Sequence, residues 1–409
     1  MSCFAGPNII SSGLVLHLDA ANSRSYDSAE NLFTNSNDFT TATWLVQEFS
    51  NSAAFTTSTI IAPDNTITGT KAYITTASSF YSIYRSATIS SGTNYAYSIY
   101  FRPAEITQGS MTIYTTANNT INFNLSTNLI TGSIIPDPNF TLVSSIITPV
   151  DNSWSRVSFN FRHNTSGLYQ FKYNLNNNLI VNNGFYVWGA QLESNINAGP
   201  YYLTTNTIKL RSTTWSDLST TSNNGTLVTG PGFSFANLGG LNFDGVDDHI
   251  TFGSNPTLTD KITVEVWVKL SNPQGPNSQG LILGRESSYR LLYSFGSIDW
   301  VCATTNNAWY TTGTFITATS INPFTDTLHI VGTYDGTNNK LYINGTLRTT
   351  GENISGNILT NGNYFLARTI AGNIDYGQGI IYSHKIYNRP LSAAEIAQNF
   401  NSIRSRFGL

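Results

Sequence analysis

The sequence predicts an all-β protein built from β-sandwich (jelly-roll) domains, with one short helix near the C-terminus. Charged residues make up only 11% of the chain, well below the roughly 25% of an ordinary soluble domain. Thr, Ser, Asn and Gly replace them, which leaves few residues for the wet face of long helices. The 409 residues also exceed the roughly 250–300 at which one core stops growing, so we expect two domains.

The clearest strand signal is 328–347, LHIVGTYDGTNNKLYINGTL. Leu328, Ile330 and Gly332 alternate with His329, Val331 and Thr333 in a two-residue period. Asp335-Gly336 opens a polar loop, and Asn344-Gly345 ends a second short strand. Asp-Gly and Asn-Gly tolerate the positive φ angles of tight turns, so this segment predicts a β-hairpin.

Other segments with strand-like alternation lie ten to twenty residues apart, a spacing typical of an antiparallel sandwich with jelly-roll connections. In the first half they are 9–19, 71–75, 81–84, 95–102, 111–115, 121–125, 154–162, 168–173 and 184–192. In the second half they are 241–243, 249–252, 262–270, 280–284, 289–293, 298–302, 309–311, 364–367 and 377–387.

The one helix signal lies near the C-terminus. Ser392 and Glu395 have the Ser-x-x-Glu spacing of a capping box. An apolar stripe follows at spacings of four and three residues: Ile396, Phe400 and Ile403. These signals predict a helix over 393–403 that docks on the sandwich.

Charge and cysteine content exclude several classes. The net charge is −3 and no basic run occurs, so we expect no nucleic-acid partner. Cys3 and Cys302 are too few for a disulfide framework, and we expect unpaired thiols made in a reducing cytoplasm. No apolar run approaches the roughly 20 residues of a membrane span. The N-terminus lacks the charge and apolar core of a signal peptide.

Four motifs, in order, carry a family resemblance: LNFDGVDDHITFG (241–253), ITVEVWVKL (262–270), HIVGTYDGTNNKLYINGTL (329–347) and IIYSHKIYNRPLSAAEIAQNF (380–400). They resemble the concanavalin A-like laminin-G type domain found in phage structural proteins and bacterial surface proteins. GLVLHLDAANSRSY (13–26) also resembles this family, where it usually runs directly into a segment like 213–234. Here about 185 residues separate the two, which implies that one domain is inserted into a loop of the other.

The insert has a looser resemblance of its own. NLFTNSNDFTTATW (31–44), GTNYAYSIYFR (92–102), NSWSRVSFNF (152–161) and YVWGAQLESNINAGPYYLTT (186–205) are similar to carbohydrate-binding-module-like jelly rolls of phage tail and head-fibre proteins. The resemblances imply residues 1–28 as the N-terminal segment and first strand of the laminin-G-like sandwich, 29–208 as the inserted jelly roll, and 209–409 as the remainder of the first sandwich.

No catalytic motif is visible. Sandwich glycosidases of the laminarinase type carry Glu-x-Asp-x-x-Glu or a close variant on one strand, where two carboxylates flank the scissile bond. Glu265 has no acidic residue two or four positions on, and Glu286 and Glu352 stand alone. A nucleophile elbow and a phosphate loop are also missing. We therefore expect no enzyme, and no cofactor with the exception of a candidate calcium ion.

The calcium candidates are Asp244, Asp247 and Asp248, whose carboxylates could supply the oxygen ligands that calcium prefers. Many laminin-G-like domains use calcium, but the resemblance does not say which residues hold it. The alternative, which the sequence favours, is a β-turn at Asp244-Gly245 with solvated carboxylates. The five histidines are scattered, and we expect them to be surface or core residues without a metal.

Sugar binding needs an aromatic ring on which a pyranose stacks, beside polar hydrogen-bonding groups. Polar Thr and Asn neighbours make Trp44, Trp300, Trp309 and Tyr310 the candidates. Trp154, Trp188 and Trp267 are expected in the core. In the alternative interpretation all seven tryptophans pack structurally.

These observations and resemblances predict a non-enzymatic phage virion protein (capsid decoration, head fibre or tail-associated) that presents glycan-binding sandwiches to the host surface. Its expected partners are other virion proteins, host glycans and further copies of itself, because sheet edges must be covered or paired. A trimer is the favoured oligomer. It would be made in the host cytoplasm, and Met1–Ser12 is a candidate anchor. The alternatives are a free lectin or adhesin and, third, a diverged glycan hydrolase.

Overall fold

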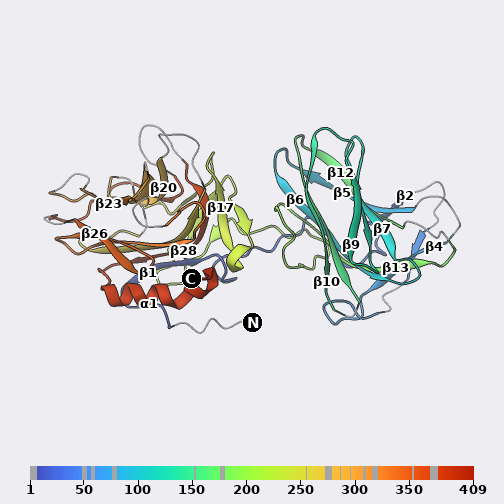
Figure 1. Ribbon diagram of the computed structural model, residues 1–409, viewed down its shortest axis with the longest axis horizontal. Helices are drawn as coiled ribbons and strands as arrows, with labels where there is room; N and C mark the ends of the chain where they lie inside the picture. The colour runs from blue at the N-terminus through green and yellow to red at the C-terminus, as the bar shows by residue number, and fades with distance from the viewer. Residues whose placement is uncertain are drawn as a thin grey trace. The chain divides into compact units, whose positions relative to one another are not determined.

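The computed structural model describes residues 7–47, 53–56, 60–75, 81–151, 153–175, 180–254, 256–271, 279–285, 287–294, 296–306, 310–315, 321–351, 354–368 and 376–409. The chain forms two compact units: Met1–Ser28 with Ser212–Leu409, and Ala29–Arg211 (Figure 1). Each unit consists of two antiparallel sheets, which confirms the all-β sandwich class with one domain inserted in the other. The sequence predicts domain boundaries at residues 28/29 and 208/209, and the two units divide at 28/29 and 211/212.

The first unit, which contains both chain ends, has two eight-stranded sheets. One has the order β16-β17-β28-β19-β24-β25-β26, with β1 also paired to β28. Its strands are β1 (Leu14–Asp19), β16 (Gly232–Ser234), β17 (Gly240–Asp244), β19 (Ile262–Leu270), β24 (Leu328–Tyr334), β25 (Asn339–Ile343), β26 (Thr346–Gly351) and β28 (Gln378–Tyr387).

The facing sheet has the order β14-β15-β18-β27-β20-β21-β22-β23. Its strands are β14 (Thr214–Trp215), β15 (Gly225–Val228), β18 (His249–Thr251), β20 (Gln279–Arg285), β21 (Tyr289–Ser294), β22 (Ser297–Cys302), β23 (Tyr310–Phe315) and β27 (Tyr364–Leu366). Short 3-10 turns lie at η1 (Ala236–Leu238) and η3 (Arg404–Phe407).

The second unit has two six-stranded sheets, ordered β10-β11-β6-β13-β4-β3 and β2-β5-β12-β7-β8-β9. The first sheet contains β3 (Ala53–Phe55), β4 (Thr70–Ile74), β6 (Asn94–Pro103), β10 (Phe140–Pro149), β11 (Ser155–His163) and β13 (Gly184–Glu193). The second contains β2 (Leu45–Gln47), β5 (Tyr81–Ile89), β7 (Gln108–Tyr114), β8 (Asn118–Asn124), β9 (Leu129–Ile134) and β12 (Gly167–Leu175).

The predicted hairpin is β24–β25, and both faces of β24 are buried. Leu328 and Ile330 point into the core between the sheets. Gly332 lies against the Trp300 indole, where an added Cβ would be 2.3 Å from a ring carbon. Any side chain at Gly332 would therefore displace Trp300. In the next turn, which joins β25 to β26, Asn344 and Gly345 both have positive φ, as an Asn-Gly hairpin requires.

Helix α1 (Ala393–Ile403) covers the outer face of the same sheet (Figure 1). Its predicted bounds and its capping box are confirmed: Glu395 N donates to Ser392 Oγ at 3.3 Å, and Ser392 N donates to the Glu395 carboxylate at 2.8 Å. Trp267 stacks on Phe400 and Phe407 with ring centroids 5.7 and 4.5 Å away. The helix and the C-terminal turn therefore bury the Trp267 ring completely.

Beneath α1 lies a buried polar cluster that the apolar stripe does not predict. The Glu265 carboxylate receives Lys385 Nζ at 2.7 Å and Asn399 Nδ2 at 2.6 Å. Asn399 Oδ1 accepts the backbone N–H of Ile10 at 2.8 Å. All three side chains are at most 1% exposed. One amide of α1 thus joins the central sheet to the N-terminal segment.

Candidate functional site

The first unit contains a cavity of about 370 Å³ between its two sheets, beside the turn that joins β17 to β18. This volume lies inside the roughly 300–1,000 Å³ range of small-ligand sites. Its lining residues are Phe243, Asp244, Gly245, Val246, Val268, Leu270, Ser271, Ile282, Tyr293, Ala367, Tyr376, Gly377, Gln378, Gly379 and Ile381.

The cavity combines an apolar wall with polar groups. Val268, Ile282 and Ile381 belong to the hydrophobic core between the sheets. Asp244 and Gln378 are exposed and lie directly opposite each other in the β17–β28 register. This combination fits a ligand that has both an apolar face and hydroxyl groups.

Backbone hydrogen bonds fix the start of β28, which forms one side of the cavity. Ser271 N donates to Gln378 O at 3.0 Å, and Gly377 N donates to Ala367 O at 2.9 Å. The first bond ties β28 to the end of β19, and the second ties the residue before β28 to the end of the facing sheet. Gln378 is therefore presented on a scaffold anchored to both sheets.

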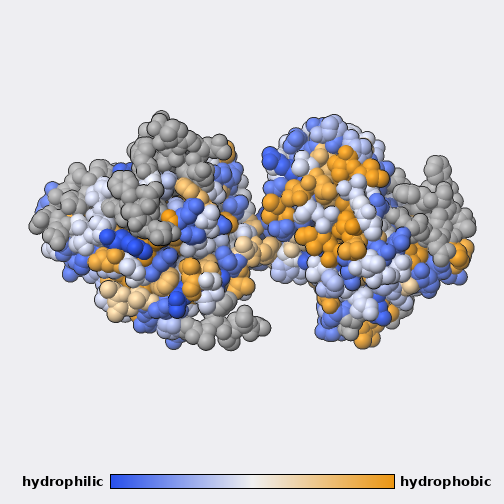
Figure 2. All heavy atoms as spheres, viewed as in Figure 1, coloured by the Kyte–Doolittle hydropathy of each residue, from blue (hydrophilic) through white to orange (hydrophobic). Residues whose placement is uncertain are grey.

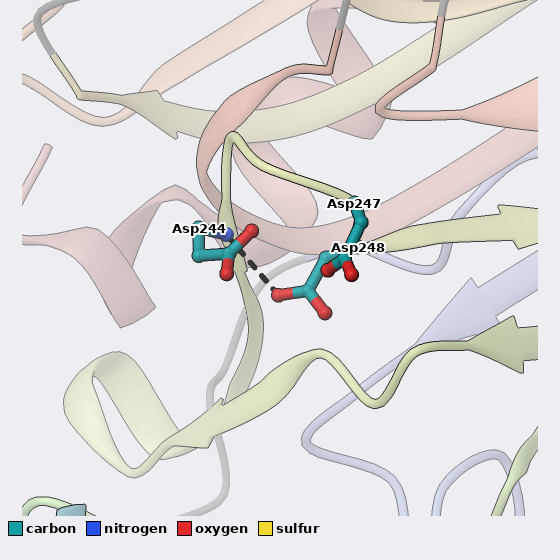
Figure 3. Close-up of side chains that lie close together, drawn as sticks. All are labelled: Asp244, Asp247 and Asp248. Carbon is teal, nitrogen blue, oxygen red and sulfur yellow. Dashed lines mark hydrogen bonds between the residues drawn. The ribbon is translucent and has the colours of Figure 1, made fainter. Parts of the chain in front are cut away.

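The acidic turn, defined as Asp244 to Asp248, contributes Asp244, Gly245 and Val246 to the lining of the cavity. Asp244 Oδ1 accepts the Val246 N–H at 2.8 Å, and Gly245 has a φ of +80°. The Asp244 N–H donates to Asp248 Oδ2 at 3.2 Å, drawn as the dashed line in Figure 3. The turn at Asp244-Gly245 therefore forms, and it brings the carboxylates together instead of dispersing them.

The three carboxylates of the acidic turn each offer an oxygen, and these oxygens lie within 4.8 Å of one another. Asp244 and Asp247 are exposed, whereas Asp248 is 6% exposed. Burial, together with the neighbouring carboxylates, raises the pKa of Asp248 to about 6. Like charges this close favour protonation or a bound cation, and oxygen-only ligands suit calcium. These three residues could hold a calcium ion.

Calcium is expected to raise the melting temperature of the protein relative to chelator, because a cation relieves the repulsion in the acidic turn. Asp248→Asn should abolish this response and leave the chelated protein at least as stable as wild type at pH 7. Asp260→Asn, at an exposed carboxylate of the same unit, is the control and should respond normally. Thermal shift measures both, and an unchanged melting temperature for wild type in calcium would exclude the site.

The pH dependence has a definite sign. The folded state of the metal-free protein binds a proton at Asp248 more tightly than the unfolded state, since the pKa rises from 3.8 to about 6. Stability without calcium should therefore fall as the pH rises through this window. The calcium response should weaken as the pH falls below about 6, because protonation removes a ligand.

The second unit presents a polar sheet face, formed by the outward side chains of β5, β12, β7 and β8. Asn174 Nδ2 donates to Ser110 Oγ at 2.9 Å and to Thr112 Oγ1 at 3.0 Å. Lys172 Nζ lies 4.7 Å from the ring centroid of Tyr114, which is 40% exposed. Burial lowers the pKa of Lys172. Asn174, Ser110 and Thr112 are at most 4% exposed, so the group that these residues present to solvent is the Tyr114 ring.

Two of the predicted sugar-stacking residues are not at the surface. Trp44 is 4% exposed and packs against Phe39 with ring centroids 4.7 Å apart. Trp300 is completely buried, and its Nε1 donates to Thr333 O and Asn339 Oδ1, both at 3.2 Å. Neither ring face is open to a sugar, because each packs in a core in spite of polar sequence neighbours.

The structure says less about the other two predicted sugar-stacking residues, Trp309 and Tyr310. Tyr310 begins β23 opposite Cys302, and Trp309 lies outside the described residues. The expected core positions of Trp154, Trp188 and Trp267 are confirmed, since each is at most 2% exposed. The expectation that Cys302 is unpaired also holds, and burial raises the pKa of its thiol to about 12.

Sequence reasoning missed the residues that do line polar surfaces. Tyr293, Tyr376 and Gln378 line the cavity, and Tyr114 lies on the polar sheet face. For Tyr114 a signal existed: Ser110, Thr112 and Tyr114 alternate with the apolar Met111 and Ile113. For Tyr293, Tyr376 and Gln378 no local pattern distinguishes cavity-lining residues from other residues at strand ends.

Residues 244–397 match a family model described as the concanavalin A-like lectin/glucanases superfamily. The matched segment contains the acidic turn and, apart from Phe243, the whole lining of the cavity. No curated protein matches the chain. In the described part of the chain, no helix is long and apolar enough to cross a membrane.

Several solved structures are similar. The receptor binding domain of botulinum neurotoxin D is 18% identical with a TM-score of 0.38, covering 48% of this chain and 50% of that one. The serotype D ligand binding domain in complex with N-acetylneuraminic acid is 17% identical with a TM-score of 0.38, covering 48% of each chain. The binding domain of Paraclostridial Mosquitocidal Protein 1 is 16% identical with a TM-score of 0.38, covering 46% and 49%. The chain thus spans about half the length of these structures.

Proposed function

We propose that this protein binds carbohydrate and that the cavity beside the acidic turn is its sugar site. The observation that carries the proposal is the cavity itself, where an apolar wall faces Asp244 and Gln378 inside the segment that matches the lectin/glucanase family model. A pyranose has an apolar C–H face and a ring of hydroxyl groups, so it can use both kinds of wall. Tyr293 and Tyr376 supply the aromatic surface.

The same cavity supports binding without hydrolysis. Glycoside hydrolysis needs two carboxyl groups on opposite sides of the scissile bond, about 5–9.5 Å apart. Among the described residues that line the cavity, Asp244 is the single carboxylate. A release of reducing ends from a bound polysaccharide would contradict this part of the proposal and favour a diverged glycan hydrolase.

A glycan array with the full chain and two variants tests the site. Gln378→Ala is expected to weaken binding of every positive glycan by at least about tenfold, which corresponds to about 1.4 kcal/mol. Asn242→Ala is the control, because Asn242 is an exposed β17 residue outside the cavity. Tyr114→Ala probes the polar sheet face of the second unit. Loss of binding in Tyr114→Ala with full binding in Gln378→Ala would move the site to that face and refute the cavity.

We also propose that the protein is a phage virion component, made in the host cytoplasm and assembled with other virion proteins. The support is the pairing of the two sandwich resemblances on one chain with a surface poor in charge. Mass spectrometry and immunogold labelling of purified phage particles test whether the protein is part of the virion. A fixed copy number on head or tail is expected, and absence from particles would favour a free lectin or adhesin.

A further inference from the structure

The second unit has an unprotected edge where two long strands end its two sheets. β9 pairs only with β8 and β10 pairs only with β11, so each is the last strand of its sheet in the described part of the chain. β9 and β10 also lie beside each other (Figure 1). Such an edge leaves every second backbone N–H and C=O of a strand without a strand partner.

In the described part of the chain, the opposite edges of these sheets are short. β2 and β3, which end the sheets on the other side, have three described residues each. Short edge strands offer little to an additional strand. β10 has ten residues and β9 has six. Past the bulge at Leu142–Ser144, β10 runs regularly from Ser144 to Pro149.

The side chains around this edge are apolar and exposed. Figure 2 shows hydrophobic surface gathered over the face of the unit where Figure 1 places β9 and β10. The exposed apolar residues are Leu129 and Ile134 on β9, Val143 and Ile146 on β10, and Val150 just after it. Their exposed fractions range from 39% for Val143 to 62% for Ile134. Clustered exposed apolar residues of this kind mark interaction sites.

β9 and β10 themselves carry no charged residue, and the exposed charges Asp151 and Arg162 lie just beyond β10 and opposite Thr141 on β11. Between the two strands, Asp137 is the one charged residue. It is 3% exposed, and its carboxylate lies 3.2 Å from His163 Nε2. The edge therefore has none of the lysines or other charges that normally prevent strand addition. An uncharged, apolar strand edge matches it best, because such a partner buries apolar surface without burying a charge.

We propose that the partner is a second copy of this chain, with β10 pairing antiparallel to β10 of that copy across a two-fold axis. The uncharged edge is complementary to itself, since two copies bring no like charges together. A two-fold contact uses the same patch on both copies and closes at two. Ile146, near the middle of the regular part of β10, would lie close to its counterpart and would bury apolar surface that is now 46% exposed.

Sedimentation or light scattering of the full chain tests this edge. Wild type is expected to form a pair, and Ile146→Lys a monomer with unchanged circular dichroism, because like charges opposite each other disfavour strand pairing. Leu168→Lys is the matched control, since Leu168 is an exposed apolar residue at the start of the interior strand β12. It should remain paired.

Charge complementation separates a pairing defect from a folding defect. Ile146→Glu alone should also be monomeric, and a mixture of Ile146→Lys with Ile146→Glu should pair again because the charges are now opposite. Residues 141–148 of wild type should become more protected from amide exchange as the protein concentration rises. Neither Ile146→Lys nor Ile146→Glu by itself should show this protection. A monomeric wild type, an oligomer unaffected by Ile146→Lys, or the trimer favoured by the sequence would each overturn the two-fold pairing.

Discussion

Lys385→Met is expected to lower the free energy of unfolding by about 3–5 kcal/mol, because it leaves a buried carboxylate without its cation. Lys385 Nζ lies 2.7 Å from Glu265 Oε1, and both side chains are 1% exposed. The remaining neighbours are Asn399, which donates one hydrogen bond, and His329, whose Nε2 lies 3.3 Å from Glu265 Oε1. Neither replaces the permanent positive charge of Lys385. Urea unfolding at pH 7 measures the effect.

The control is the double variant Glu265→Gln with Lys385→Met. Replacing both partners removes the unpaired charge, so it should recover part of the stability lost in Lys385→Met. Asn399 can still donate to the amide oxygen of the new glutamine. If the double variant is less stable than Lys385→Met alone, the charge pair is not what holds this cluster together.

The same cluster predicts that the free energy of unfolding decreases at acid pH. Burial alone would raise the pKa of Glu265, but Lys385 and His329 outweigh it and hold the pKa well below the usual value of 4.5. The ionised carboxylate therefore contributes stability that is present above pH 4.5 and is lost as the pH falls below it. Lys385→Met should make this decrease smaller.

Trp300→Ala is expected to destabilise the protein by about 3–5 kcal/mol through the cavity that it leaves. The Trp300 indole fills the space above Gly332 and donates to Thr333 O and Asn339 Oδ1. Thermal or urea unfolding measures the loss. Trp300→Phe should lose less, because most of the ring volume is kept.

This variant also separates the structural role of Trp300 from a role in sugar stacking. Under conditions where Trp300→Phe is fully folded, its glycan binding should equal that of wild type. A folded Trp300→Phe with lost binding and unchanged stability would show instead that the ring contacts a ligand.

Local sequence patterns determined the elements whose signals lie within a few residues. The capping box at Ser392 and Glu395 predicts α1 with its observed bounds, because the two hydrogen bonds are local. The alternation at 262–270 predicts β19, and Asn344-Gly345 predicts the turn after β25. The acidic turn is also visible in the sequence, since its three carboxylates lie within five residues.

Where a strand departs from regular pairing, the pattern fails. The sequence predicts no strand at β9 or β10. In β10 the bulge at Leu142–Ser144 shifts the alternation by one residue, so that Ile147 packs on the core while Ile146 points outward. The edge proposed for self-association is therefore hidden from a search for period-two alternation.

Only the tertiary structure decided which polar and aromatic residues face solvent. Trp44 and Trp300 have polar sequence neighbours, yet packing in the two cores buries both rings. Asn399 is buried beneath α1, where it donates a hydrogen bond to Glu265, 134 positions away. The cavity is lined by residues from Phe243 to Ile381 on two facing sheets. Burial and cavities depend on packing between segments far apart in the chain, and local periodicity contains no information about which segments meet.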